Sequence, residues 1–137
     1  PVHALMSAKH PLARVKELSL VETLNYPIAL TMPGAGSRIL IDATALAGGA
    51  VLLPRFESNS IRLLAQFASK SPGITFLSRL CAFSGLKSGE LAAIRLRDRL
   101  MSIARIEVLT LAERTLPLAA QQFQDHLHRA LRKAAQN

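Results

Sequence analysis

The sequence predicts an α/β fold, a mainly parallel sheet flanked by helices. Strand patterns alternate with helix patterns through residues 26–78, which is the order expected of a parallel sheet. Half of the 137 residues are hydrophobic, so one domain, or a large piece of one, can bury a core. Because the chain has no Trp, one Tyr and five Phe, we expect that core to be mainly aliphatic.

The first predicted strand is a short apolar run, Val2 to Met6. It should end in a turn over residues 8–13, because Pro11 disfavours a helical conformation at His10.

A short helix is predicted next by a capping box. Ser19 and Glu22 have the spacing at which each side chain can accept a hydrogen bond from the other residue's backbone. The helix should run from about Leu20 to Leu24, and residues 26–31 should form a buried strand.

A loop rich in Pro and Gly leads from that strand to a longer helix. Ser37 is a favourable N-cap for this helix, and Gly48 with Gly49 should stop it. Its predicted apolar face consists of Ile39, Leu40, Ala43 and Leu46.

The run from Val51 to Glu57 is predicted as the next strand. Pro54 cannot donate a ladder hydrogen bond, which places this strand at an edge or at a bulge. The following helix has an apolar face made by Ile61, Leu64, Ala65 and Ala68, and Ile74 to Leu77 is predicted as a short buried strand.

The remaining third of the chain contains two further predicted strands, Leu91 to Leu96 and Ile103 to Leu111, after an irregular stretch over residues 80–90. Pro117 should start the last helix, where its missing N–H costs nothing. Basic residues fill the second half of that helix and suit the negative end of its dipole.

The net charge is +8, with 17 Lys and Arg against 9 Asp and Glu. The excess is concentrated in residues 69–137, which carry 11 basic and 5 acidic groups. A basic half can indicate a nucleic-acid or acidic partner, and it can equally be a solvated surface. Aromatic residues do not interleave with the basic ones, which argues against a base-stacking platform.

Residues for metal binding or catalysis are sparse. Cys81 is the only cysteine, so no internal disulfide forms, and this fits a reducing cytoplasm. His126 and His128 lie two apart on a helix and point to different faces. No carboxylate pair suggests acid–base chemistry. We therefore expect no enzyme, no catalytic residue, no metal and no cofactor.

The termini and apolar runs give two further expectations. No apolar run approaches the roughly 20 residues that span a bilayer, so no membrane partner is expected. The chain shows no signal peptide and does not begin with Met, which predicts a piece of a longer, cytoplasmic protein.

Two predicted helix N-termini could bind a small anion. At the first, Ser58, Asn59, Ser60 and Ile61 offer hydroxyls, an amide and free backbone N–H groups. At the second, Gly34, Gly36 and Ser37 could offer backbone N–H groups. Thr75 and Phe76 could form the wall of such a site. The structural alternatives are N-caps at the first, a turn at the second and a core strand at the third.

Six short motifs are spread in order along nearly the whole chain. They are His10-Pro11-Leu12-Ala13, Ser19-Leu20 through Tyr26-Pro27, Ser58-Asn59-Ser60, Gly73-Ile74-Thr75-Phe76-Leu77-Ser78-Arg79, Ser88-Gly89-Glu90-Leu91 and Ala119-Ala120-Gln121-Gln122-Phe123. In these motifs and in their order, the chain resembles the effector-binding domain of LysR-type transcriptional regulators. Departures from the family pattern occur at Lys70-Ser71-Pro72, at Ser78 and at Pro117-Leu118.

This resemblance implies a periplasmic-binding-protein-like (type 2) fold, in which two subdomains enclose a cleft. It implies that residues 1–116 form the second subdomain and that residues 117–137 form a C-terminal helix that packs on the first. The winged helix-turn-helix that binds DNA would lie outside this chain.

The implied function is that of a sensor in a transcription factor. The partners would be a small organic acid in the cleft, DNA through that absent N-terminal domain, and a second copy in a homo-oligomer. The alternative is a solute-binding protein or an enzyme domain that reuses the same bilobal fold.

Overall fold

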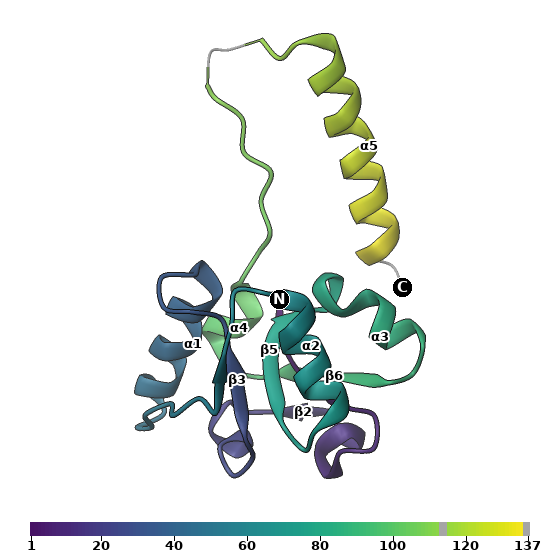
Figure 1. Ribbon diagram of the computed structural model, residues 1–137. Coiled ribbons are helices and arrows are strands. Elements are labelled where there is room, and N and C mark those ends of the chain that lie inside the picture. The colour runs from purple at the N-terminus through teal and green to yellow at the C-terminus, as the bar shows by residue number, and fades with distance from the viewer. Residues whose placement is uncertain (113–114, 136–137) are drawn as a thin grey trace. The chain divides into compact units, whose positions relative to one another are not determined.

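The computed structural model describes residues 1–112 and 115–135. The chain divides into two compact units, Pro1–Arg105 and Ile106–Asn137 (Figure 1). Within the described residues, the first unit contains a six-stranded sheet and all helices but one, and the second contains the helix α5 (Leu118–Ala135).

The sheet confirms the predicted α/β class. Its strands lie in the order β2-β6-β1-β5-β3-β4, and all are mutually parallel except β1, which runs antiparallel between β5 and β6. The predicted strands around Ile28, Arg55 and Thr75 therefore share one sheet. The strands are β1 (Val2–Ser7), β2 (Glu17–Leu18), β3 (Ile28–Leu30), β4 (Phe56–Glu57), β5 (Ile74–Ser78) and β6 (Leu91–Leu96).

Helices cover both faces of this sheet, as Figure 1 shows with α2 in front of it. Because side chains alternate along a strand, β1 contributes to both layers. Met6 packs with Ile41 of α1 in one cluster, and Leu5 packs with Leu64 of α2 in the other. The helices of the first unit are η1 (Pro11–Arg14), η2 (Val21–Thr23), α1 (Gly36–Ala47), α2 (Ile61–Lys70), η3 (Arg79–Ala82), α3 (Phe83–Lys87) and α4 (Arg99–Ile103).

The predicted capping box is present and starts a short 3₁₀ helix, η2. The Ser19 N–H donates to Glu22 Oε2 at 2.6 Å, and the Glu22 N–H donates to Ser19 Oγ at 3.4 Å. The hydrogen bond from the Ser19 N–H to the Glu22 carboxylate lowers the pKa of Glu22, and Arg97, at 3.0 Å from that carboxylate, lowers it further.

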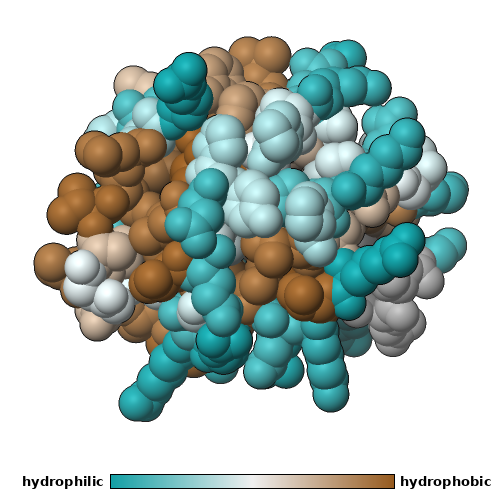
Figure 2. Space-filling model, turned by 90° about the horizontal axis from the view of Figure 1, so that it is seen from below, coloured by the Kyte–Doolittle hydropathy of each residue, from teal (hydrophilic) through white to brown (hydrophobic). Residues whose placement is uncertain are grey.

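The predicted apolar face of α1 is wrong, although one of its residues, Leu40, packs partly against the core. Ile39 and Leu46 are 59% and 75% exposed, and the buried positions are instead Arg38, Ile41, Thr44 and Ala45. The helix turns this way because Arg38 finds polar partners inside the fold. Apolar side chains gather on the left of the surface in Figure 2, the side on which Figure 1 places α1.

The predicted start of α1 is also off. Ala35 is the N-cap, and it makes no side-chain capping bond, so Ser37 is not the cap. The predicted stop at Gly48 is confirmed, and Gly49 has φ +72°, which glycine adopts without strain.

Two predicted strands differ from the structure. The strand predicted over Val51 to Glu57 contains only Phe56 and Glu57, although it lies at the sheet edge as Pro54 indicated. Ile103 ends α4, and residues 104–111 pair with no strand in the described part of the chain. Alternating apolar residues alone do not make a strand, which needs a neighbour for its hydrogen bonds.

Residues 80–90 are more regular than expected, because η3 and α3 occupy most of them. In the second unit the last helix is confirmed. It begins at Leu118, and the Pro117 carbonyl accepts from the Gln121 N–H at 3.0 Å. Among the described residues, no helix is long and apolar enough to cross a membrane.

Candidate functional site

Two helix N-termini lie close together at the carboxyl ends of two neighbouring strands. The parallel strands β3 and β4 are neighbours and end at the same edge, where α1 follows β3 and α2 follows β4. Because α1 and α2 pack on opposite faces, this edge is a topological switch point. Ligands of open α/β sheets bind at such points. We call residues 31–38 the α1 start and residues 57–62 the α2 start.

The α1 start leaves its first backbone amides unpaired. Ile39 is the first residue of α1 whose N–H has a backbone acceptor, the Ala35 carbonyl at 3.1 Å. Within the described residues, no protein group accepts from the amides of Gly36, Ser37 and Arg38, and the first turn holds no acidic side chain.

Two hydroxyls and a glycine complete the α1 start. Thr31 Oγ1 lies 3.5 Å from Ser37 Oγ. Gly34 has φ +91°, a backbone conformation that L side chains rarely adopt. Amides, hydroxyls and the positive end of the helix dipole together suit a small anion.

The α2 start has the more favourable sequence but already uses its hydroxyls. Ser60 Oγ accepts from the Leu63 N–H at 3.4 Å, and Ser58 Oγ accepts from the Ser60 N–H at 3.0 Å. Asn59 is exposed, and Ile61 packs partly against the core. These residues cap α2, and their binding of a ligand stays a prediction.

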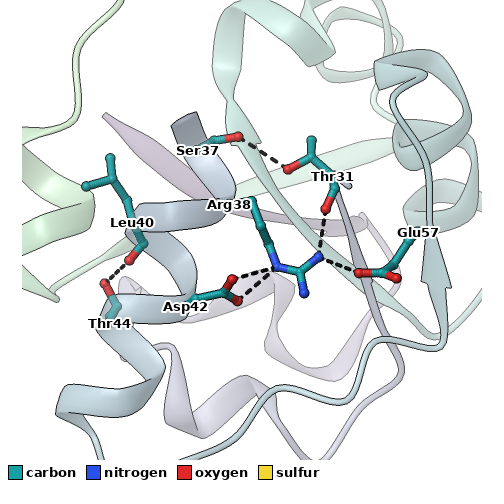
Figure 3. A network of polar contacts seen from close by, with 7 residues as sticks. All are labelled: Thr31, Ser37, Arg38, Leu40, Asp42, Thr44 and Glu57. Atoms are coloured by element: carbon teal, nitrogen blue, oxygen red, sulfur yellow. Dashed lines mark hydrogen bonds and ion pairs between the residues drawn. The ribbon is translucent and has the colours of Figure 1, made fainter. Parts of the chain in front are cut away.

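A buried arginine joins the two helix starts (Figure 3). Arg38 Nε donates to the Asp42 carboxylate at 2.9 and 3.0 Å, and Arg38 Nη1 donates to the Thr31 carbonyl at 2.8 Å. The same Nη1 donates to the carboxylate of Glu57, at the end of β4. Burial alone would lower the pKa of Arg38, but hydrogen bonds to Glu57 and Asp42 outweigh it and raise the pKa.

Sequence reasoning missed this network. Arg38 and Asp42 have the i,i+4 spacing of a helical ion pair, which is the one local signal. The contact with Glu57 joins residues far apart along the chain, and no local pattern indicates it.

Thr75 and Phe76 lie inside the first unit on opposite faces of the sheet. Thr75 pairs with Leu5 and faces the α2 layer, whereas Phe76 packs in the α1 layer. Both are buried, and Thr75 Oγ1 has no hydrogen-bond partner in the described structure. Because they point to opposite faces of β5, the two side chains do not form one wall. That either residue contributes to a site stays a prediction.

The described residues offer little for metal binding or for thiol chemistry. No group of three His, Cys, Asp or Glu within the described ranges could hold a metal ion. Cys81 is exposed, and partial desolvation raises the pKa of its thiol. It lies beside an open groove of about 640 Å³ between α2 and the η3–α3 segment.

The family comparison covers nearly the whole chain: residues 1–132 match the model of the LysR substrate binding domain. The RuBisCO operon transcriptional regulator of Acidithiobacillus ferrooxidans is 29% identical over 97 residues, which are 71% of this chain and 31% of that protein.

Two solved structures share the fold. The Synechocystis PCC6803 CcmR regulatory domain in complex with 2-PG has a TM-score of 0.72 and 19% identity, covering 95% of this chain and 62% of that one. The effector binding domain of QuiR in complex with shikimate has a TM-score of 0.65 and 17% identity, covering 96% of this chain and 61% of that one. The chain thus spans less than two thirds of each of these proteins.

Proposed function

The chain belongs to the LysR substrate-binding domain family, and from this premise we propose that it is the effector-sensing part of a DNA-binding transcriptional regulator. Residues 1–116 would form the second subdomain of the sensing domain, and residues 117–137 a helix that packs on the first subdomain. DNA would be bound by another domain of the full regulator. The family favours this role over the solute-binding alternative and over catalysis.

The effector that we propose is a small organic acid bound at the carboxyl edge of β3 and β4. The observation that carries this proposal is the uncapped α1 start, where three amides and two hydroxyls lack a full set of partners in the described structure. The ligands named for two similar structures, shikimate and 2-PG, fit the same class.

The two helix starts would contact different parts of the effector. Gly36 and Ser37 would donate to the anionic group of the effector, and Gly34 provides the turn that exposes them. The α2 start, with Ser58, Asn59, Ser60 and Ile61, would contact the rest of the ligand. Thr75 and Phe76 would support the site from within the sheet.

Substituting Gly36 tests this division directly. Gly36 is the first residue of α1, where proline is well tolerated and its missing N–H removes one amide from the site. Ala35 already has an extended backbone that suits a following proline, and a Cβ at Gly36 would meet no atom within 4 Å.

We expect Gly36→Pro to weaken binding of shikimate and 2-phosphoglycolate by about tenfold, the usual effect of losing one hydrogen bond to a charged group. Gly36→Ala adds a Cβ and keeps the amide, so it should bind as the wild type does. The measurement is an NMR titration that follows the backbone amides of residues 34–38. Equal binding by the proline and alanine variants would contradict the proposed site.

We also propose that the protein associates with itself. Large apolar side chains are exposed on α1 and on the segment that follows it: Ile39, Leu46, Val51 and Leu53. Exposed apolar surface of this kind seeks a partner. Light scattering should show a mass above that of one chain, and a monomer at high concentration would contradict this part of the proposal.

A further inference from the structure

We propose that Arg38 is a positioning residue that holds the two helix starts of the effector site at a fixed separation. This inference rests on the proposed function. It concerns a side chain that supports the ligand site from behind.

The contacts of Arg38 join three elements. Its guanidinium binds Asp42 on α1, the Thr31 carbonyl at the end of β3 and the Glu57 carboxylate at the end of β4 (Figure 3). A guanidinium is planar and its donors point in fixed directions, so these three acceptors are held in one geometry. With only 11% of its side chain exposed, Arg38 has few alternative positions.

Both ends of this connection adjoin the proposed site. Thr31 carries the hydroxyl that faces Ser37 in the α1 start. Glu57 directly precedes Ser58, whose N–H donates to the Leu30 carbonyl at 3.1 Å and whose hydroxyl supports the cap of α2. Moving Arg38 would therefore shift donors at both helix starts.

Charge is a second possible effect of the same side chain. Arg38 compensates one of the two carboxylates that it binds, and without it both would repel an incoming anion. The two effects need variants that separate them.

Two substitutions separate the effect of geometry from the effect of charge. Arg38→Lys keeps the positive charge but loses the planar fork that reaches three acceptors. Arg62→Met loses a charge in the first turn of α2, where the exposed Arg62 makes no hydrogen bond or ion pair within the described residues.

The first measurement is amide hydrogen exchange without ligand. We expect Arg38→Lys to speed exchange at the Ser58 amide by about tenfold, because breaking a buried ion-pair network lowers the free energy of local opening. It should also shift the NMR signals of Gly36 and Ser37. Arg62→Met should leave all three amides as in the wild type. Wild-type behaviour of Arg38→Lys at both helix starts would overturn the positioning role.

The second measurement is titration with shikimate and with 2-phosphoglycolate. Arg38→Lys should weaken the binding of whichever acid the wild type binds by at least about fivefold, and more than Arg62→Met does. Because Arg38→Lys keeps the charge, wild-type binding by Arg38→Lys together with a loss in Arg62→Met would mean that charge alone matters. That result, or equal losses in the two variants, would overturn the inference. Failure of the wild type to bind either acid overturns the proposed function and the positioning role with it. Wild-type binding that survives Arg38→Lys overturns the positioning role alone.

Discussion

The α1 start and the α2 start occupy the same edge of the sheet but treat their backbone amides in opposite ways. At the α2 start, Ser58 and Ser60 turn their hydroxyls onto the helix's own N–H groups. At the α1 start, Ala35 occupies the cap position and leaves those groups unpaired within the described chain. The side chain of Arg38 also joins the α1 start to β4. Among the described hydrogen bonds, the α2 start reaches other elements only through the Glu57 carboxylate and through the Ser58 N–H, which donates to the Leu30 carbonyl.

This difference separates a good helix start from a good binding site. Residues that cap well satisfy the helix and leave little for a ligand. An uncapped N-terminus costs stability, which other contacts must offset, and here the Arg38 network does so. The less favourable cap therefore marks the more available anion site.

The largest expected effect on stability comes from removing the Arg38 contacts at the α1 start. Arg38→Met should lower the free energy of unfolding by about 2–3 kcal/mol, because it leaves the carboxylates of Asp42 and Glu57 unpaired. These carboxylates are 49% and 33% exposed, so water moderates the cost. Arg62→Met at the α2 start should cost less than about 0.5 kcal/mol. Urea unfolding measures both, and similar losses would remove the contrast.

Serine substitutions test the caps themselves. Ser60→Ala should destabilise the protein by about 1 kcal/mol, the usual cost of losing an N-cap. Ser37→Ala should cost less than about 0.5 kcal/mol, because Ser37 caps nothing. Thermal unfolding followed by circular dichroism measures the pair. A larger loss at Ser37 would reverse our assignment of the two helix starts.

The smallest expected effect is the dependence of stability on pH. Neither helix start contains a histidine, so we expect this dependence to come from histidines elsewhere in the fold. His10 is buried, its Nδ1 accepts from the Leu12 N–H at 3.1 Å, and desolvation lowers its pKa. The unfolded chain then binds more protons than the folded one below the ordinary histidine pKa, so stability should fall as the pH drops from about 7 to 5.

The substitution His10→Asn should flatten this dependence, because it keeps an acceptor for Leu12 and does not titrate. Part of the slope should remain from His3, whose pKa is also lowered by burial. Urea unfolding at several pH values measures the slope. An unchanged slope in the variant would place the titrating group elsewhere.

Local patterns predicted the parts of this fold that depend on neighbours in sequence. The capping box of Ser19 and Glu22 and the strands β1, β5 and β6 are present where expected. The run from Ile103 to Leu111 has the composition of a strand but has no pairing partner among the described residues. Composition indicates what a segment can form, and pairing depends on the rest of the fold.

The candidate site shows the same limit. The helix starts were found from Ser, Asn and Gly, which have strong local preferences. Local patterns do not tell which helix start keeps its backbone amides unpaired. Nor do they tell that Arg38 is buried and Ile39 exposed, because this depends on the contact between Arg38 and Glu57 on another strand. The buried face of α1 lies roughly opposite the predicted one, and the periodicity alone could not decide between the two.

The position of β1 also sets an order for synthesis and folding. β1 pairs residues 2–5 with residues 75–78 and residues 3–7 with residues 91–95, so its two partners are made long after it. On the ribosome the strand must wait, with Leu5 and Met6 unburied, until β5 and β6 have both emerged. Contacts this distant along the chain slow folding and lengthen the time in which the unpaired strand can bind a chaperone or another chain.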